Sequence, residues 1–200
     1  NANKSSHSTL GLKMTSLQPR YLFILFITIF SFSPFAFSAD LEAGKTKASS
    51  CLACHGQNGV STIPSYPSLA GQRAIYLEYQ LLAFQSGKRN NPVMQDQVAH
   101  LSRTDLKNIS AYFSRLPAAI ASTETQKQDG SKIDMCKGCH GGTAEGRGGF
   151  PRLAGQQAEY LKKQLLDFKS RARQGGPMNA ITSSLSEQDI NEIANYLSQL

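Results

Sequence analysis

The sequence predicts an all-α protein in which two small helical domains of similar sequence follow one another. Three observations support this prediction. The chain repeats itself at a spacing of about 84 residues, apolar residues recur at helical spacing within each copy, and no segment alternates polar and apolar residues as a strand does. Two copies at so long a period indicate duplicated domains, because a solenoid needs shorter and more numerous units.

Four pairs of segments carry the repeat. They are CLACHG and CKGCHG (from Cys51 and Cys136), YPSLAGQ and FPRLAGQ (from Tyr66 and Phe150), YLEYQLLAF and YLKKQLLDF (from Tyr76 and Tyr160), and LSRTDLKNISAYFSRL and LSEQDINEIANYLSQL (from Leu101 and Leu185). Pro117 ends the last helix of the first copy, and a stretch rich in Ala, Ser, Thr and Gln follows it. The predicted organisation is a leader over 1–39, an N-terminal domain over 40–116, a linker over 117–130 and a C-terminal domain over 131–200.

Each copy is expected to contain two principal helices. The first spans 72–86 in one copy and 156–170 in the other. The second begins after Ser102 or Ser186, where the pairs Ser102 with Asp105 and Ser186 with Asp189 resemble capping boxes with Asp in place of the usual Glu. Domains of about 80 residues have thin cores and usually need a staple, a metal or a cofactor.

The beginning of the chain predicts an export signal. Arg20 precedes the apolar run YLFILFITIF, and Ala36-Phe37-Ser38 has the form that a signal peptidase accepts, so cleavage is expected near Ser38 or Ala39. The alternative is an uncleaved membrane anchor, although the apolar stretch has only 17 residues and contains Pro34.

The formal charge of +7 does not indicate nucleic-acid binding. Three of the 21 basic residues lie in the first 38 residues, which contain no acid, so the rest has 18 basic and 14 acidic residues, a net charge of +4. No run of five like charges exists. A basic cluster late in the chain is either a docking surface for an acidic partner or a solvated helix face; its members are Lys162, Lys163, Lys169, Arg171 and Arg173.

All four cysteines lie in two C-x-x-C-H motifs, formed by Cys51, Cys54 and His55 and by Cys136, Cys139 and His140. This is the attachment signature of c-type haem, in which two sulfurs bond the vinyl groups of the porphyrin and the next residue places an imidazole on the iron. Zinc or a redox dithiol is the alternative. Paired zinc motifs usually lie about 12–20 residues apart, whereas 81 residues separate Cys54 from Cys136, and a thioredoxin-like dithiol needs a βαβ setting. The motifs therefore predict two covalently attached haem c groups.

Two methionines are candidates for the second axial ligand of each iron. Met94 and Met178 lie 39 and 38 residues after His55 and His140, at equivalent positions of the repeat. Each is expected in a Pro- and Gly-rich loop before the last helix. A thioether ligand opposite histidine raises the reduction potential. The alternative is that both methionines fill the core.

One proline position and two tyrosine positions also recur in both copies. A backbone carbonyl at Pro67 or Pro151 is a candidate acceptor for the histidine Nδ1–H, which would fix the ring, and an ordinary turn is the alternative. The tyrosines are expected to pack between helices rather than to bond a haem; they are Tyr76, Tyr112, Tyr160 and Tyr196.

From about Asp40 to Leu200 the sequence resembles the cytochrome c4 family of dihaem cytochromes c. The resemblance rests on the two haem motifs, the two P-x-L-A-G-Q segments, Met94 and Met178, and the paired C-terminal helices. It implies two tandem class I cytochrome c domains, each wrapped around one haem and related to the other by a pseudo-twofold axis. It also implies a periplasmic electron carrier, often loosely associated with the membrane, between a respiratory donor complex and a terminal oxidase.

The expected function is therefore electron transfer by a two-domain monomer that is not an enzyme and whose partners are redox proteins. One alternative is a small dihaem oxidoreductase of the peroxidase or thiosulfate-oxidising type. Chemistry at the iron needs an open or labile ligand position, and the two candidate methionines speak against one. A second alternative is an electron-transfer subunit of a dehydrogenase complex, which would share every motif described above.

Overall fold

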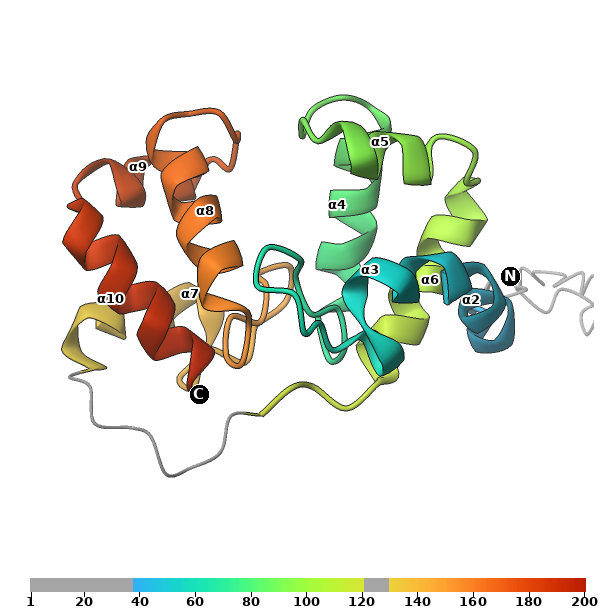
Figure 1. Ribbon diagram of the computed structural model, residues 1–200, viewed down its shortest axis with the longest axis horizontal. Helices are drawn as coiled ribbons and strands as arrows, with labels where there is room; N and C mark the ends of the chain where they lie inside the picture. Colours follow the sequence, from blue (N-terminus) through green and yellow to red (C-terminus); the bar gives the residue numbers. More distant parts are fainter. Residues whose placement is uncertain (1–37, 121–129) are drawn as a thin grey trace, which may run out of the picture. The chain divides into compact units, whose positions relative to one another are not determined.

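The regular structure is helical in the residues that the computed structural model describes, 38–120 and 130–200 (Figure 1). The helices of the first range are α2 (Leu41–Ala48), η1 (Ser49–Cys51), α3 (Leu52–His55), η2 (Gln57–Gly59), α4 (Ala74–Gln85), α5 (Pro92–Val98) and α6 (Arg103–Arg115). Those of the second range are η4 (Gly130–Ile133), α7 (Asp134–His140), α8 (Ala158–Lys169), α9 (Pro177–Ser183) and α10 (Glu187–Ser198). Within these ranges no strand forms, and Arg147 and Phe150 make an isolated bridge.

The first principal helix of each copy lies inside the range that the sequence predicts. Helix α4 begins two residues after the predicted start at 72, and α8 begins two residues after 156. The residues before them, Arg73 and Gln157, have ψ angles of 123° and 126°, which are not helical values. The predicted helices are confirmed with slightly shorter bounds.

The second principal helix of each copy begins at the predicted capping box. The Ser102 hydroxyl accepts the Asp105 backbone N–H at 3.1 Å, and the Asp105 carboxylate accepts the Ser102 N–H at 3.0 Å. Ser186 and Asp189 make the same pair of bonds at 3.1 and 3.0 Å. Both boxes satisfy N–H groups that a helix start otherwise leaves without a partner.

Each copy has its own apolar core, built on its last helix. The first core comprises Ala48, Leu77, Ile109 and Phe113. The second comprises Ile133, Ala144, Ala154, Leu161, Leu185, Ile190, Ile193, Ala194 and Leu197. Helices α2 and α4 pack on α6, and η4 and α8 pack on α10. The α2–α6 crossing is close, because a Cβ on Gly44 would lie 2.2 Å from the Asn108 carbonyl oxygen.

Residues 39–200 form one compact unit, in which hydrogen bonds join the two copies. The predicted leader, except its last two residues, and positions 121–129 of the predicted linker lie outside the described residues. Of the helices in 38–120 and 130–200, none has both the length and the apolar character that crossing a membrane requires.

Candidate haem-attachment sites

Both C-x-x-C-H motifs lie on helical backbone. The first motif runs from the end of η1 through α3, and the second closes α7. On a helix, side chains three positions apart share a face, so the two thiols of each motif project on the same side. His55 and His140 are buried, with 6% and 5% of their surface exposed. Cys139 is exposed, and the other three cysteines are half-buried.

A glycine turns the chain sharply after each histidine. Gly56 has φ and ψ of 84° and 154°, and Gly141 has 92° and 156°. Residues with a side chain rarely adopt this conformation. A Cβ on Gly56 would also lie 1.9 Å from the Val60 carbonyl oxygen. The motif therefore needs glycine in its sixth position for a steric reason.

A proline carbonyl fixes each histidine ring. His55 Nδ1 lies 2.8 Å from the Pro67 oxygen, and His140 Nδ1 lies 2.9 Å from the Pro151 oxygen. Because a carbonyl only accepts, Nδ1 is the donor and carries the proton, which leaves the Nε2 lone pair for a metal. The predicted role of both prolines is confirmed.

Burial favours the neutral form of both imidazoles. It lowers the pKa of His55 and of His140 from the ordinary value, and the hydrogen bonds to the proline carbonyls oppose this only in part. Neutral imidazole is the form that binds a metal. The rings of Tyr66 and Phe150 make T-shaped contacts with those of His55 and His140, at centroid distances of 6.2 and 6.0 Å.

The thiols do not have the character of a redox dithiol. Burial raises the pKa of the Cys51 and Cys136 thiols, whereas a reactive C-x-x-C thiol has a lowered pKa. All four cysteines are free of disulfides. In the two described ranges, no three His, Cys, Asp or Glu side chains converge into a group that could hold a metal ion by themselves.

The donor set fits haem c. Each site offers two free thiols on one helical turn and a neutral imidazole whose Nε2 is available. Large apolar side chains beside the motifs and beside Met94 are exposed, as a flat apolar macrocycle requires of its surroundings. They are Val93 (53%), Met135 (59%) and Phe150 (45%).

The two candidate methionines lie in helices, so the predicted loop positions are wrong. Met94 is in the first turn of α5, and Met178 is in the first turn of α9. Each helix begins with a proline at N1, where the missing N–H costs no hydrogen bond. Both methionines are half-buried. The same prolines that suggested loops therefore start short helices.

Two arginines that join the copies were not identified as such from the sequence. Arg89 donates to Gln80, Tyr160 and Gln164 at 2.7, 3.0 and 2.7 Å. Its repeat equivalent, Arg173, donates to Gln164, Tyr76 and Gln80 at 2.6, 3.0 and 2.8 Å. Their occurrence at one position of both copies was the available signal.

Arg173 departs from its expected role, and two of the tyrosines have a role that was not predicted. Arg173 is 8% exposed, so it does not belong to a solvated or docking face with the rest of the predicted basic cluster. Tyr76 and Tyr160 accept hydrogen bonds from arginines of the other copy. Tyr112 and Tyr196 pack against the two cores, as predicted.

Comparison with known proteins supplies an independent result. The sequence profile of the cytochrome c family matches residues 128–200. A cytochrome c4 of Pseudomonas aeruginosa is 37% identical over 180 residues, which cover 82% of this chain and 90% of that protein. A protein of Thiomonas intermedia named thiosulfate dehydrogenase electron acceptor is 33% identical over 80% of this chain and 82% of its own length. The crystal structure of reduced cytochrome c4 from Pseudomonas stutzeri gives a TM-score of 0.73 at 32% identity, covering 82% of this chain and 100% of that chain.

Proposed function

Because the chain belongs to the cytochrome c4 family, we propose that it is a dihaem electron carrier of the periplasm. Haem 1 is bonded to Cys51 and Cys54 in the domain 40–116, and haem 2 to Cys136 and Cys139 in the domain 131–200. When bound, each haem supplies an iron that cycles between Fe(II) and Fe(III) and so holds one electron.

The observation that carries this proposal is the hydrogen bond from each histidine Nδ1 to a proline carbonyl. At 2.8 and 2.9 Å these bonds fix the imidazole tautomer and direct Nε2 away from the proline. This orientation supports Nε2 as the atom that binds the iron. His55 and His140 are assigned to the irons of haem 1 and haem 2.

Met94 and Met178 are assigned as the opposite ligands. Their support is their equivalent, half-buried position in the first turn of α5 and of α9. An iron held on both sides by protein ligands has no open position for a substrate, so it exchanges electrons without binding one. This favours the carrier over an enzyme of the peroxidase type.

The proposed partners are redox proteins. The predicted export signal supports a periplasmic location, and the family resemblance supports a respiratory donor complex and a terminal oxidase as donor and acceptor, with loose membrane association. A second candidate role is favoured by the relative named thiosulfate dehydrogenase electron acceptor, which matches 80% of this chain. In that role the chain takes electrons from a dehydrogenase that oxidises a sulfur compound.

Haem attachment is tested by producing the full chain in a host that matures c-type cytochromes. Intact-mass spectrometry of the unfolded product should show two covalently bound haems. Replacing both Cys51 and Cys54 by Ser should leave one, and replacing Cys136 and Cys139 should leave the other. A wild-type product with fewer than two bound haems contradicts the proposal.

The choice between partners is tested by stopped-flow absorbance. The reduced protein is mixed with membranes that contain a cytochrome oxidase, and the oxidised protein with a thiosulfate dehydrogenase and thiosulfate. Rapid, oxidase-dependent oxidation supports the respiratory role, and rapid thiosulfate-dependent reduction supports the second. A protein that exchanges electrons only with small-molecule reagents is not a carrier for either partner.

A further inference from the structure

A single peptide group connects each proposed haem ligand to the opposite copy. The carbonyl of the peptide between Pro67 and Ser68 accepts the His55 Nδ1–H at 2.8 Å. The N–H of the same peptide, on Ser68, donates to the Gln156 side-chain oxygen at 2.8 Å. Gln156 belongs to the second copy, 88 residues further along the chain.

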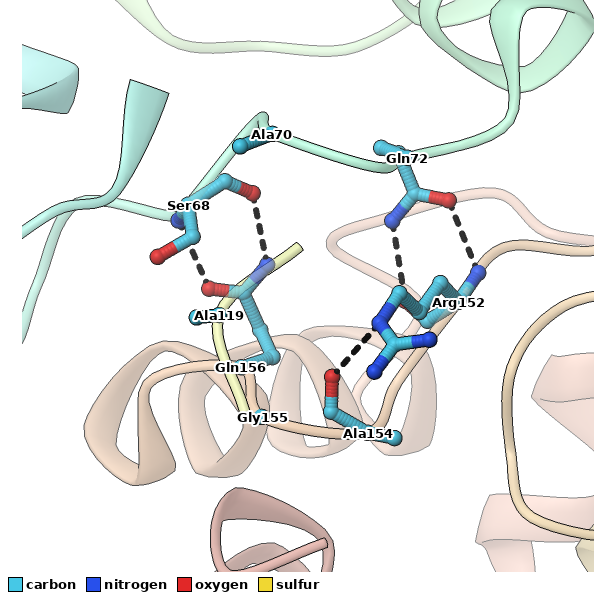
Figure 2. Close-up of a pocket in the computed structure, with 8 residues that line it drawn as sticks. All are labelled: Ser68, Ala70, Gln72, Ala119, Arg152, Ala154, Gly155 and Gln156. Carbon is cyan, nitrogen blue, oxygen red and sulfur yellow. Dashed lines mark hydrogen bonds between the residues drawn. The ribbon is translucent and has the colours of Figure 1, made fainter. Parts of the chain in front are cut away.

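The arrangement recurs with the two copies exchanged. The carbonyl of the peptide between Pro151 and Arg152 accepts the His140 Nδ1–H at 2.9 Å, and the N–H of this peptide donates to Gln72 Oε1 at 2.7 Å. Figure 2 shows the two glutamine side chains, each lying against the backbone of the other copy. Gln72 and Gln156 are the last residues of the two P-x-L-A-G-Q segments.

Both glutamines are held in place by further bonds. The side-chain nitrogen of Gln72 donates to the Arg152 carbonyl at 2.8 Å, and that of Gln156 donates to the Ser68 carbonyl at 2.9 Å. Each glutamine therefore bonds both the N–H and the carbonyl of one residue in the other copy. Each oxygen also accepts the N–H of its own next residue, at 2.9 and 3.0 Å. The two residues are 6% and 7% exposed. Both acceptors are therefore buried and oriented.

Hydrogen bonds in such a chain polarise one another. A peptide whose N–H is bonded to an acceptor has a more negative carbonyl oxygen. That oxygen draws the histidine Nδ1 proton more strongly and makes Nε2 a better electron donor, which favours Fe(III) over Fe(II).

From this geometry we propose that each glutamine lowers the reduction potential of the haem in the opposite copy: Gln156 acts on haem 1 and Gln72 on haem 2. The proposal rests on the proposed function, because it needs His55 and His140 to bind the irons. The glutamines are positioning residues that act through the Pro67–Ser68 and Pro151–Arg152 peptides.

The test is a crossed comparison of two variants of the haem-loaded full chain, Gln156→Leu and Gln72→Leu. Leucine removes the acceptor, so Gln156→Leu should raise the potential of haem 1 and leave haem 2 near its wild-type value, while Gln72→Leu should do the reverse. The expected shift is about two- to threefold in the one-electron equilibrium, or about 20–30 mV. Spectroelectrochemical titration gives the potentials, and hyperfine-shifted haem-methyl NMR signals identify the haem.

A second pair of variants gives a sign test and keeps the interface filled. Gln156→Glu and Gln72→Glu retain an acceptor for the peptide N–H and add negative charge. The reduction potential of the haem in the opposite copy should then equal the wild-type value or lie below it. Gln157→Leu is the matched control, because it removes a bond of 2.5 Å from the second copy to Ser61 of the first without touching either peptide. It should leave both potentials unchanged.

The outcomes separate this inference from the proposed function. If the wild-type chain lacks two bound haems, the proposed function fails and the inference fails with it. If both haems are present and a leucine variant shifts the haem of its own copy, both haems equally or neither, only the inference is overturned. A shift confined to the opposite haem, upward for Leu and either absent or downward for Glu, supports it, and a rise with Glu overturns it.

Discussion

Each candidate axial histidine depends on two neighbours that differ in kind. Pro67 supplies a carbonyl oxygen that selects the imidazole tautomer of His55, and the bond measures 2.8 Å. Gly56 supplies a backbone conformation, with φ of 84°, that lets the chain leave the helix immediately after the ligand. One neighbour therefore sets the chemistry of the nitrogen, and the other sets the path of the backbone.

Replacing Gly56 by alanine should destabilise the folded protein by at least about 2 kcal/mol. The reason is both torsional and steric, because the added Cβ would meet the Val60 carbonyl oxygen at 1.9 Å. Gly142→Ala is the control, since a Cβ there meets no atom within 4 Å, and its free energy of unfolding should stay within about 0.5 kcal/mol of wild type. Denaturant unfolding of the haem-loaded chain checks both; equal losses would refute the steric account.

Replacing Met94 or Met178 by alanine should open one iron and leave the other unchanged. The affected haem should lose its sulfur-to-iron charge-transfer band, bind carbon monoxide when reduced and fall in potential by on the order of 100 mV. In each variant the haem of the other copy is the internal control, because Met94 and Met178 belong to different copies. Unchanged spectra in either variant would remove that methionine from the proposed ligands.

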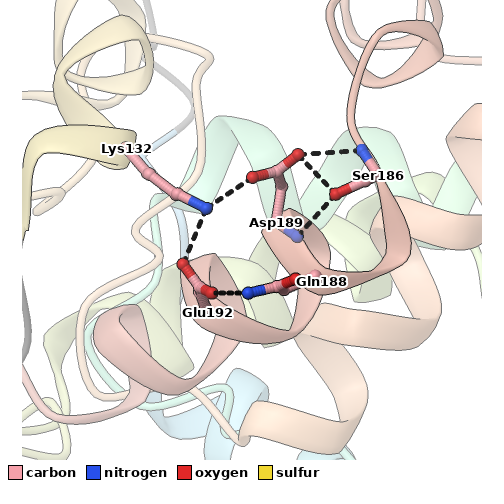
Figure 3. A network of polar contacts seen from close by, with 5 residues as sticks. All are labelled: Lys132, Ser186, Gln188, Asp189 and Glu192. Atoms are coloured by element: carbon pink, nitrogen blue, oxygen red, sulfur yellow. Dashed lines mark hydrogen bonds and ion pairs between the residues drawn. The ribbon is translucent and has the colours of Figure 1, made fainter.

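At the scale of elements, the start of α10 is fixed by charge as well as by its cap. Figure 3 shows Lys132, at the end of η4, between two carboxylates of α10, with Nζ at 2.6 Å from Asp189 and 2.7 Å from Glu192. The bond to Asp189, followed by that to Glu192, raises the pKa of Lys132 to about 12. The hydrogen bonds from Lys132 and Ser186 hold the pKa of Asp189 well below its usual range.

This network predicts a specific loss of stability in acid. A carboxylate with a lowered pKa in the folded state contributes stability that is complete above its ordinary pKa and is lost as the pH falls toward the folded value. Wild-type stability should therefore decline below about pH 4, and Asp189→Asn should show a lower stability at pH 7 and a shallower acid decline. Thermal unfolding across pH 2–7 measures this. The control Glu187→Gln removes an equal charge in the same turn and should lose stability with falling pH as steeply as the wild type. If Asp189→Asn also loses stability as steeply as the wild type, the prediction is contradicted.

The elements were predictable where their signals were local. Ser102 and Asp105 bond each other three positions apart, so the sequence alone located the start of α6. The short helices that contain Met94 and Met178 were missed because Pro92 and Pro177 were interpreted as loop residues. Proline also suits the first turn of a helix. Whether a proline lies in a loop or starts a helix depends on the conformation of the residues that follow it.

At the scale of the whole molecule, two arginines and two glutamines join the copies in a closed ring. The oxygens of Gln80 and Gln164 each accept from both Arg89 and Arg173, at 2.6 to 2.8 Å. Each guanidinium also lies 4.5 Å from the ring centre of a phenylalanine in its own copy, Phe84 or Phe168. The planar fork of arginine suits several acceptors at once.

Replacing Arg173 by glutamine should lower the free energy of unfolding by about 1.5–3 kcal/mol, the usual range for hydrogen bonds to a charged group. It should also increase amide hydrogen exchange in α4 and α8, which carry its acceptors. Arg171→Gln removes an exposed arginine from the same loop and should change stability by no more than about 0.5 kcal/mol. Comparable losses in the two variants would show that the ring adds nothing to the joining of the copies.

The contacts between copies were beyond sequence reasoning for a geometric reason. Arg89 and Tyr160 are 71 residues apart, and Arg173 and Tyr76 are 97 apart. No periodicity or spacing rule links such positions, because the pairing depends on how the two folded copies meet. The haem motifs and the bond from His140 to Pro151 were accessible because each lies within one copy and is repeated in the other.

In the opposite copy, the glutamines that end the P-x-L-A-G-Q segments bond only main-chain atoms of position x, which is Ser68 in one copy and Arg152 in the other. The side chains at x take no part in these four bonds and make contacts within their own copy: Ser68 Oγ accepts the Ser61 N–H at 3.1 Å, and Arg152 Nε donates to the Ala154 oxygen at 3.1 Å. A substitution at x therefore leaves the partners of these four bonds in place, whereas a substitution of Gln72 or Gln156 removes two of the bonds at once.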